Sequence, residues 1–268
     1  MALFHYHVHL IGRSNGKAGR SVVAAAAYRA GVALWDERLN KIWDYSKKHG
    51  VTHREILVPV GSHAWAKDRQ TLWGNVEASE KRVDAQLARE IEGAIPREIP
   101  SGERVPWVRE HLRTFVDLGM VVDFAIHDPA PGLNPHFHAL ATLRPLEGNG
   151  FAKKKNRAWN DRSLVEAWRS HYEEVLTRAL LAAGTMARVC RLSYLRQGIA
   201  KPPQGHQSRA ECHRQKRSGI AREGPGVPAS SGEAAALSLL QAIDLRRKET
   251  YRERSHLDRA MDAPHKGR

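Results

Sequence analysis

Three histidines near the middle of the chain have the residue type and spacing of a metal site. In the segment AIHDPAPGLNPHFHALA, His136 and His138 lie two residues apart, so in a strand their side chains project from one face. His127 ends the preceding apolar stretch, across a Pro/Gly/Asn loop suited to a hairpin, and is close enough to join them. Three imidazoles from neighbouring strands can hold one divalent cation and leave positions open for a phosphate oxygen, which the cation polarises. The sequence therefore predicts a cation site, against the alternative that histidines are simply tolerated beside a sheet.

A tyrosine is the candidate nucleophile. In SVVAAAAYRAG, Tyr28 follows a run of alanines and precedes Arg29, shortly after the basic, glycine-rich loop GRSNGKAGR. Small side chains would let a DNA backbone approach this helix closely, and phosphodiester cleavage suits a basic chain with one cation site. The serines have no G-x-S-x-G motif around them, and the cysteines lack a supporting context. The alternative is that Tyr28 packs in the core.

Two carboxylates are candidate partners of these groups. Glu90 and Glu92 share one face if AREIEGAIP is a strand, as the alternation of its residues indicates. A carboxylate there can orient a metal-bound histidine through its free N–H, or accept a proton. The alternative is a pair of solvated surface charges.

A second row of histidines, His5, His7 and His9, also shares one strand face. At a rise of roughly 3.3 Å per residue, the first and third side chains stand about 13 Å apart. One ion cannot reach both ends of that row. We therefore expect a polar strand face near DNA rather than a second metal site.

The elements that must position these side chains follow from hydrophobic periodicity and from capping and turn residues. Ser21 is a candidate N-cap of the tyrosine helix, which ends near Gly31, and Asp161 begins a long helix that ends at Gly184. The pattern predicts an α+β fold, a central antiparallel sheet with helices packed on it. The expected strands are 4–11, a strand–turn–strand in 40–61, 88–95, 120–127 and 135–143, and the expected helices are 21–31, 65–85, 104–119 and 161–184.

The charge of the chain indicates a polyanionic partner. Lys and Arg number 43 against 29 Asp and Glu, a net charge of +14, which suits nucleic acid or an anionic membrane surface. The alternative is an ordinary solvated basic surface. The cations expected to contact DNA flank the tyrosine or lie in the loop AKKKNR; they are Arg13, Lys17, Arg20, Arg29, Lys153, Lys154 and Lys155.

The compartment and the domain limits also follow from composition. No apolar run approaches the roughly 20 residues of a spanning helix, and histidines interrupt the apolar N-terminus, so we expect neither membrane insertion nor a signal peptide. Two cysteines without C-x-x-C spacing indicate a reducing, cytoplasmic setting. Beyond about residue 205 the composition shifts to Gln, Ser, Arg, Gly and Pro. We therefore expect one domain over 1–205, a flexible linker over 206–232 and a basic helical tail over 233–268.

The same residues resemble a known family. HFH matches the histidine–hydrophobe–histidine signature of HUH endonucleases, which nick single-stranded DNA with a tyrosine. The order RSNGKAGRSVVAAAAYRAG, DYSKKHGV, AQLAREIEGAIP, AIHDP and NPHFH is similar to the MobA/MobL branch of plasmid relaxases over about residues 1–206. One stretch departs from it: Cys190-Arg191-Leu192 stands where relatives usually show Asp-His-Arg.

The resemblance implies a mechanism and partners. Tyr28 would attack at the nick site of a transfer origin, leaving a 5′-phosphotyrosine and a free 3′-hydroxyl, and the three histidines would bind Mg²⁺ or Mn²⁺. Imidazole ligands also suit Zn²⁺. Glu92 would be the acidic residue beside the site, with Glu90 second, on a five-stranded antiparallel sheet flanked by helices. The partners implied are single-stranded or supercoiled plasmid DNA at the origin of transfer (oriT), accessory mobilisation proteins and a type IV coupling protein. The alternatives are a rolling-circle replication initiator and a catalytically inactive DNA-binding relative.

Overall fold

The computed structural model describes residues 4–13, 21–129, 132 and 134–200. The chain divides into two compact units, 1–191 and 192–268. In the second unit the described residues contain one 3-10 turn, Leu195–Gln197. The expected linker over 206–232 and helical tail over 233–268 lie outside the described residues.

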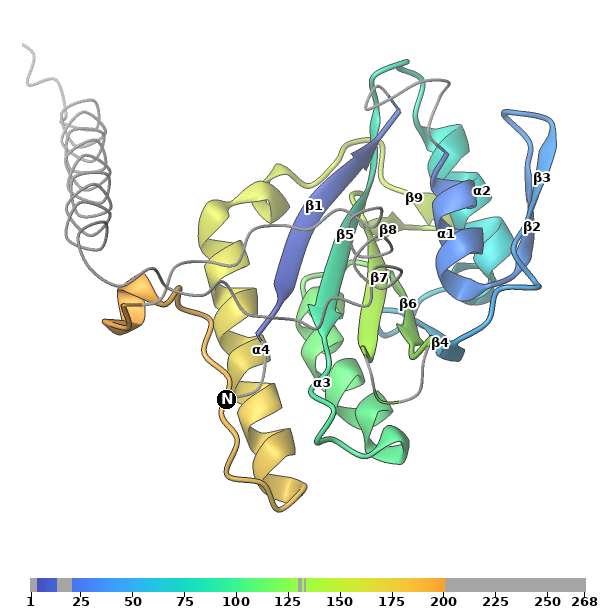
Figure 1. Ribbon diagram of the computed structural model, residues 1–268. Helices are drawn as coiled ribbons and strands as arrows, with labels where there is room; N and C mark the ends of the chain where they lie inside the picture. Colours follow the sequence, from blue (N-terminus) through green and yellow to red (C-terminus); the bar gives the residue numbers. More distant parts are fainter. Residues whose placement is uncertain (1–3, 14–20, 130–131, 133, 201–268) are drawn as a thin grey trace, which may run out of the picture. The chain divides into compact units, whose positions relative to one another are not determined.

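A five-stranded sheet forms the centre of the first unit (Figure 1). Its order is β1-β5-β7-β6-β4, and every neighbouring pair is antiparallel, as the sequence predicts. The strands are β1 Tyr6–Gly12, β4 Val51–Leu57, β5 Gln86–Ala94, β6 Val122–His127 and β7 His136–Thr142.

Helices cover both faces of this sheet, and the sheet separates the core into two clusters. Helices α3 (Arg104–Val116) and α4 (Arg162–Ala182) pack on one face, with Phe137, Ala139 and Ala141 of β7. Helices α1 (Val22–Ala30) and α2 (Arg69–Ser79) pack on the other, with Leu140. Because side chains alternate along a strand, His136 and His138 project to the side of α1.

Helix α1 is built as its sequence predicts but uses its alanines differently. The Ser21 hydroxyl accepts a hydrogen bond from the Ala24 N–H at 3.2 Å, and Gly31 ends the helix with a left-handed φ of 61°. Ala26 and Ala27 are buried in the core. The small side chains therefore bring the helix close to the sheet, and the expectation that they clear a path for DNA is wrong for these two.

The remaining elements differ from expectation in pairing and length. A two-stranded ribbon joins β2 (Ala33–Asp36), which the sequence pattern missed, to β3 (Lys41–Asp44), so β3 and β4 pair with different partners. Helix α2 ends at Ser79 rather than near residue 85. The short elements are β8 Leu146–Glu147, β9 Gly150–Phe151 and the 3-10 turns Ala64–Lys67, Ser101–Glu103 and Arg157–Asn160.

Among the residues that the structure describes, no helix combines the length and apolar composition needed to cross a membrane.

Candidate metal and nucleophile site

The three predicted histidines meet at the end of the β6–β7 hairpin. His127 lies directly opposite His136 in the strand register, and His138 follows on the same face. The ring centroids stand 5.1–5.3 Å apart, and one ligand nitrogen from each ring lies within 4.8 Å of the others. This is the only such cluster of three or more His, Cys, Asp or Glu residues found among the described residues. The three histidines that the sequence pattern groups therefore lie together in the structure, and their role as cation ligands stays a prediction.

Each of these rings has one nitrogen engaged by a protein acceptor. His127 Nε2 lies 2.7 Å from the carbonyl oxygen of Arg29, and His136 Nδ1 lies 2.7 Å from that of Asn134. His138 Nδ1 lies 3.3 Å from a carboxylate oxygen of Glu90. Because these oxygens accept, the engaged nitrogens carry the protons, and the other nitrogen of each ring keeps its lone pair. Such outer partners fix the tautomer and orientation of metal-binding histidines.

Burial keeps two of the imidazoles neutral. It lowers the pKa of His127 to about 4, aided by the positive charge of Lys48, although the Arg29 carbonyl acts the other way. Burial also lowers the pKa of His136. A cation ligand must be deprotonated, so these groups fit a divalent cation at neutral pH.

Glu90 joins the histidines to the tyrosine helix. Its side chain is 5% exposed, and its Oε1 accepts from His138 and from the guanidinium of Arg29, while Oε2 lies 2.7 Å from His9 Nε2. Burial acts to raise the pKa of this carboxyl, but the His138 hydrogen bond and the Arg29 and His9 charges outweigh it and lower the pKa to about 2. Glu90 is therefore ionised and bound on both sides.

Glu92 is less engaged. Its Oε2 lies 4.0 Å from His138 Nδ1, and its side chain is 34% exposed. The two carboxylates share one face, as the strand pattern predicts, but it is Glu90 that hydrogen-bonds the histidine.

Tyr28 stands at the exposed side of α1, with 43% of its surface accessible. The interpretation of Tyr28 as a core residue is therefore wrong. Its ring packs edge-on against Tyr45 with centroids 5.3 Å apart, and Lys48 Nζ stands 3.8 Å from the Tyr28 ring centroid. The next residue, Arg29, contacts both His127 and Glu90.

Three basic side chains hold the C-terminal end of α1. The last carbonyls of a helix have no partner within the helix, so N–H donors are favourable there, whether charged as in Lys48 and Arg54 or neutral as in His127. Lys48 Nζ donates to the Tyr28 carbonyl at 2.8 Å, His127 Nε2 to that of Arg29, and Arg54 to that of Ala30 at 3.1 Å. A candidate metal ligand thus also anchors the helix that carries Tyr28.

The N-terminal histidine row forms a polar strand face, as expected. His7 lies opposite Glu92 and His9 opposite Glu90, and all three histidines are exposed.

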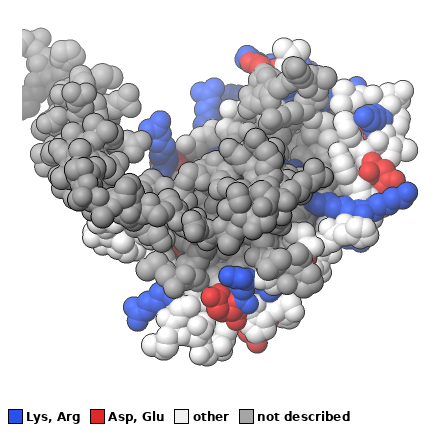
Figure 2. Space-filling model, viewed as in Figure 1, with Lys and Arg blue, Asp and Glu red and all other residues white. Residues whose placement is uncertain are grey.

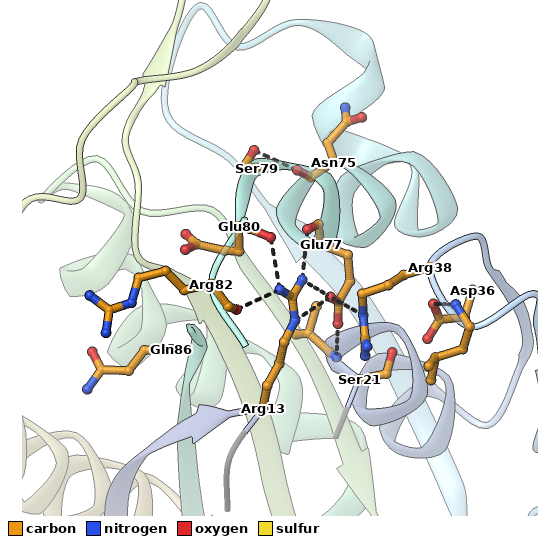
Figure 3. Close-up of polar contacts among 12 residues, drawn as sticks. Arg13, Ser21, Asp36, Arg38, Asn75, Glu77, Ser79, Glu80, Arg82 and Gln86 are labelled. Atoms are coloured by element: carbon orange, nitrogen blue, oxygen red, sulfur yellow. Dashed lines mark hydrogen bonds and ion pairs between the residues drawn. The ribbon is translucent and has the colours of Figure 1, made fainter. Parts of the chain in front are cut away.

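Arg13 has a structural role in the interior, whereas the sequence pattern predicts that it contacts DNA (Figure 3). It is buried, and it donates to the Glu77 carboxylate and to the carbonyls of Glu77, Glu80 and Arg82. The guanidinium therefore binds carbonyls in the last turn of α2 and in the segment that follows it, where a helix leaves carbonyls without partners. Its donors are occupied by protein, so Arg13 is not among the DNA contacts that we propose.

The other expected DNA contacts fall into three groups. Lys17 and Arg20 lie outside the described residues. Arg29 is half-buried against Glu90. Lys153 and Lys154 are exposed, whereas Lys155 binds Glu80 and the Gln86 carbonyl.

The cations do not gather in one patch of the described surface visible in Figure 2. Lys and Arg side chains stand there in several separate places, with acidic side chains among them.

Comparison with known proteins decides the family. The model described as the MobA/MobL family matches residues 20–217. The chain belongs to this family. The "Conjugal transfer protein TraA" of Agrobacterium fabrum is 33% identical over 237 residues, which cover 77% of this MobA/MobL chain and 21% of the relative. The chain thus spans about a fifth of that relative's length.

For two further similar proteins, the match spans a larger share of the other protein's length. The "Mobilization protein MobL" of Acidithiobacillus ferridurans is 33% identical over 253 residues, 82% of this chain and 65% of that protein. A solved structure reported as "Molecular Basis of Vancomycin Resistance Transfer in Staphylococcus aureus" superposes with a TM-score of 0.67 at 32% identity. It covers 72% of this MobA/MobL chain and 100% of the solved chain.

Sequence reasoning missed Lys48 and Tyr45, which contact Tyr28. Both lie in DYSKKHGV, some twenty residues beyond the tyrosine, and no local spacing marks them. Only the turn after β3, in which Lys48 N–H donates to the Tyr45 carbonyl, brings them to the end of α1.

Proposed function

We propose that this MobA/MobL protein is a relaxase that nicks one strand of plasmid DNA at an origin of transfer, with Tyr28 as nucleophile. One observation carries the proposal. Arg29, the residue after the exposed Tyr28, contacts His127 through its carbonyl and Glu90 through its guanidinium. The tyrosine helix is therefore attached directly to the histidine cluster.

The proposed step is a transesterification. The Tyr28 Oη–phosphorus bond forms and the phosphorus–O3′ bond breaks, leaving a 5′-phosphotyrosine and a free 3′-hydroxyl. The phenol loses one proton and the leaving O3′ oxygen gains one. Water carries the proton between them. Rejoining runs the same step backwards.

The chain's own residues position this step. His127, His136 and His138 would hold a divalent cation, which supplies charge to polarise the scissile phosphate when bound. Glu90 holds His138 and Arg29 in place, and the Glu92 carboxylate stands 4.0 Å from His138 Nδ1. We propose Mg²⁺ or Mn²⁺ as the physiological ion; the imidazole donors also suit Zn²⁺.

DNA would be held mainly through its phosphates. The exposed Lys153 and Lys154, with Lys17 and Arg20, are the proposed contacts, and such binding weakens steeply with salt. We propose supercoiled plasmid DNA with a single-stranded nick region at oriT as substrate, with accessory mobilisation proteins and a type IV coupling protein as cytoplasmic partners. The relatives named for conjugal transfer and mobilisation favour this function over rolling-circle replication.

The test is nicking of a supercoiled plasmid that carries the cognate oriT, in the presence of Mn²⁺. Wild type should give relaxed product, and EDTA should abolish it. Tyr28→Phe should give none, because the phenyl ring keeps the packing and loses the attacking oxygen. Tyr45→Phe, which changes the neighbouring ring in the same way, should still nick. A wild type without relaxed product, or a Tyr28→Phe variant that nicks normally, contradicts the proposal.

A further inference from the structure

Lys48 is placed against the candidate nucleophile by two contacts at once. Its Nζ stands 3.8 Å from the centre of the Tyr28 ring and donates to the Tyr28 carbonyl at 2.8 Å. The first contact places a cation over the π-face of the phenol, and the second fixes the ammonium at the end of α1. Neither contact was anticipated from the sequence.

The main chain around Lys48 is held on both sides. Its own N–H donates to the Tyr45 carbonyl, and the Tyr45 N–H donates to the carbonyl of Val32, just after α1. On the other side, the Asp128 N–H donates to the Gly50 carbonyl at 2.7 Å, which ties the segment to the end of β6. The loop that carries the ammonium therefore spans from the tyrosine helix to the strand of His127.

The structure assigns Lys48 as a positioning residue of the nicking reaction, a cation that fixes the Tyr28 ring and stabilises the negative charge its oxygen develops. This inference rests on the proposed nicking function. When the Oη–phosphorus bond forms, the phenol loses its proton, and a cation held over the ring attracts the charge left on the oxygen. In the reverse step the same cation stabilises the departing phenolate, so it accelerates both nicking and rejoining.

The surroundings of Lys48 make its charge sensitive to pH. Burial, followed by the positive charge of Arg29, lowers the pKa of Lys48 to about 8. The ammonium is therefore present at neutral pH and is lost as the pH rises through about 8. The titratable or charged groups facing it are Tyr28 and Arg29 of α1, His127 of β6 and His136 of β7.

The simpler role is that Lys48 only caps the helix, and Arg54 supplies the matched control. Arg54 also donates to a terminal carbonyl of α1, that of Ala30, but no cation–π contact joins it to Tyr28 among the described contacts. Arg54→Met removes a cap and leaves the cation over the ring. Lys48→Met removes the charge and keeps most of the stem, and Lys48→Arg keeps a cation that can stack on the ring.

The experiment measures nicking of the oriT plasmid in Mn²⁺ as a function of DNA concentration for wild type and the three variants. Lys48→Met should lower the maximal rate about 10-fold with the half-saturating DNA concentration nearly unchanged, and Lys48→Arg should recover most of the loss. Arg54→Met should have a much smaller effect on the maximal rate. An unchanged rate in Lys48→Met, no recovery in Lys48→Arg, or an equal loss in Arg54→Met overturns the inference.

A second readout remains informative if Lys48→Met does not fold. The ratio of the wild-type rate to the Lys48→Arg rate should fall as the pH rises through about 8, because arginine keeps its charge where lysine loses it. A constant ratio across that range overturns the inference. If wild type does not nick at all, the proposed function fails together with the role of Lys48; if it nicks and Lys48→Met matches it, only the role of Lys48 fails.

Discussion

At the scale of residues, one buried carboxylate connects the two halves of the proposed site. Glu90 accepts from His138 on the sheet and from Arg29 on α1, and its other oxygen meets His9. Its charge is stable in this place because three basic groups surround it, which is why its pKa falls to about 2 despite burial. Removing that charge should therefore affect the cation site and the tyrosine helix together.

Glu90→Gln should weaken Mn²⁺ binding by about 10- to 100-fold, because the isosteric amide no longer holds His138 and Arg29 by charge. Calorimetric titration of the protein with Mn²⁺ measures the effect, and a melting curve shows whether the variant is folded. Glu92→Gln is the matched control. The Glu92 carboxylate lies 4.0 Å from His138 and is more exposed than that of Glu90, so this variant should lose less Mn²⁺ affinity. A larger loss in Glu92→Gln would contradict the role given to Glu90.

At the scale of elements, strand β5 places Glu90 and Glu92 on one face and a close contact on the other. Gly93 lies between Glu92 and Ala94, where an added Cβ would clash with Phe137 Cε1 and stand 3.1 Å from Tyr172 Cε1. Both rings belong to the buried core under α4. The glycine in EIEGAIP therefore lets two aromatic rings pack directly against the strand.

Gly93→Ala should destabilise the protein by about 1–3 kcal/mol, because rings in a packed core cannot move aside freely. Gly74→Ala, in α2, meets nothing within 4 Å and should stabilise by up to about 1 kcal/mol. Urea unfolding of both variants measures the difference. Equal stability of Gly93→Ala and wild type would show that Phe137 and Tyr172 do not hold this strand as described.

The same elements show what the sequence could and could not predict. Residue types and local spacing identified the strand of Glu90 and Glu92, both caps of α1 and the three histidines, because periodicity and capping are local signals. The burial of Arg13, the pairing of β3 with β2 and the contact of Lys48 with Tyr28 depend on segments distant in the chain. Local spacing carries no signal for such contacts, so these assignments failed or were missed.

At the scale of the whole molecule, the fold brings separate parts of the first unit to one sheet end. The histidines come from β6 and β7, Glu90 from β5, Tyr28 from α1 and Lys48 from the loop before β4. The net charge of +14 suits the DNA substrate that we propose. In the proposed reaction, Tyr28 binds the cut DNA strand covalently.

Mass spectrometry of the protein trapped on DNA tests directly whether Tyr28 carries the strand. The wild-type chain is incubated with oriT plasmid and Mn²⁺, denatured, and digested with nuclease and protease, and the peptide carrying a nucleotide is mapped. We expect a 5′-phosphotyrosine at Tyr28, in the peptide that ends at Arg29 after cleavage on the carboxyl side of arginine, and no adduct in Tyr28→Phe. An adduct on Tyr45 or on any other residue, or nicked plasmid without a covalent adduct, would contradict it.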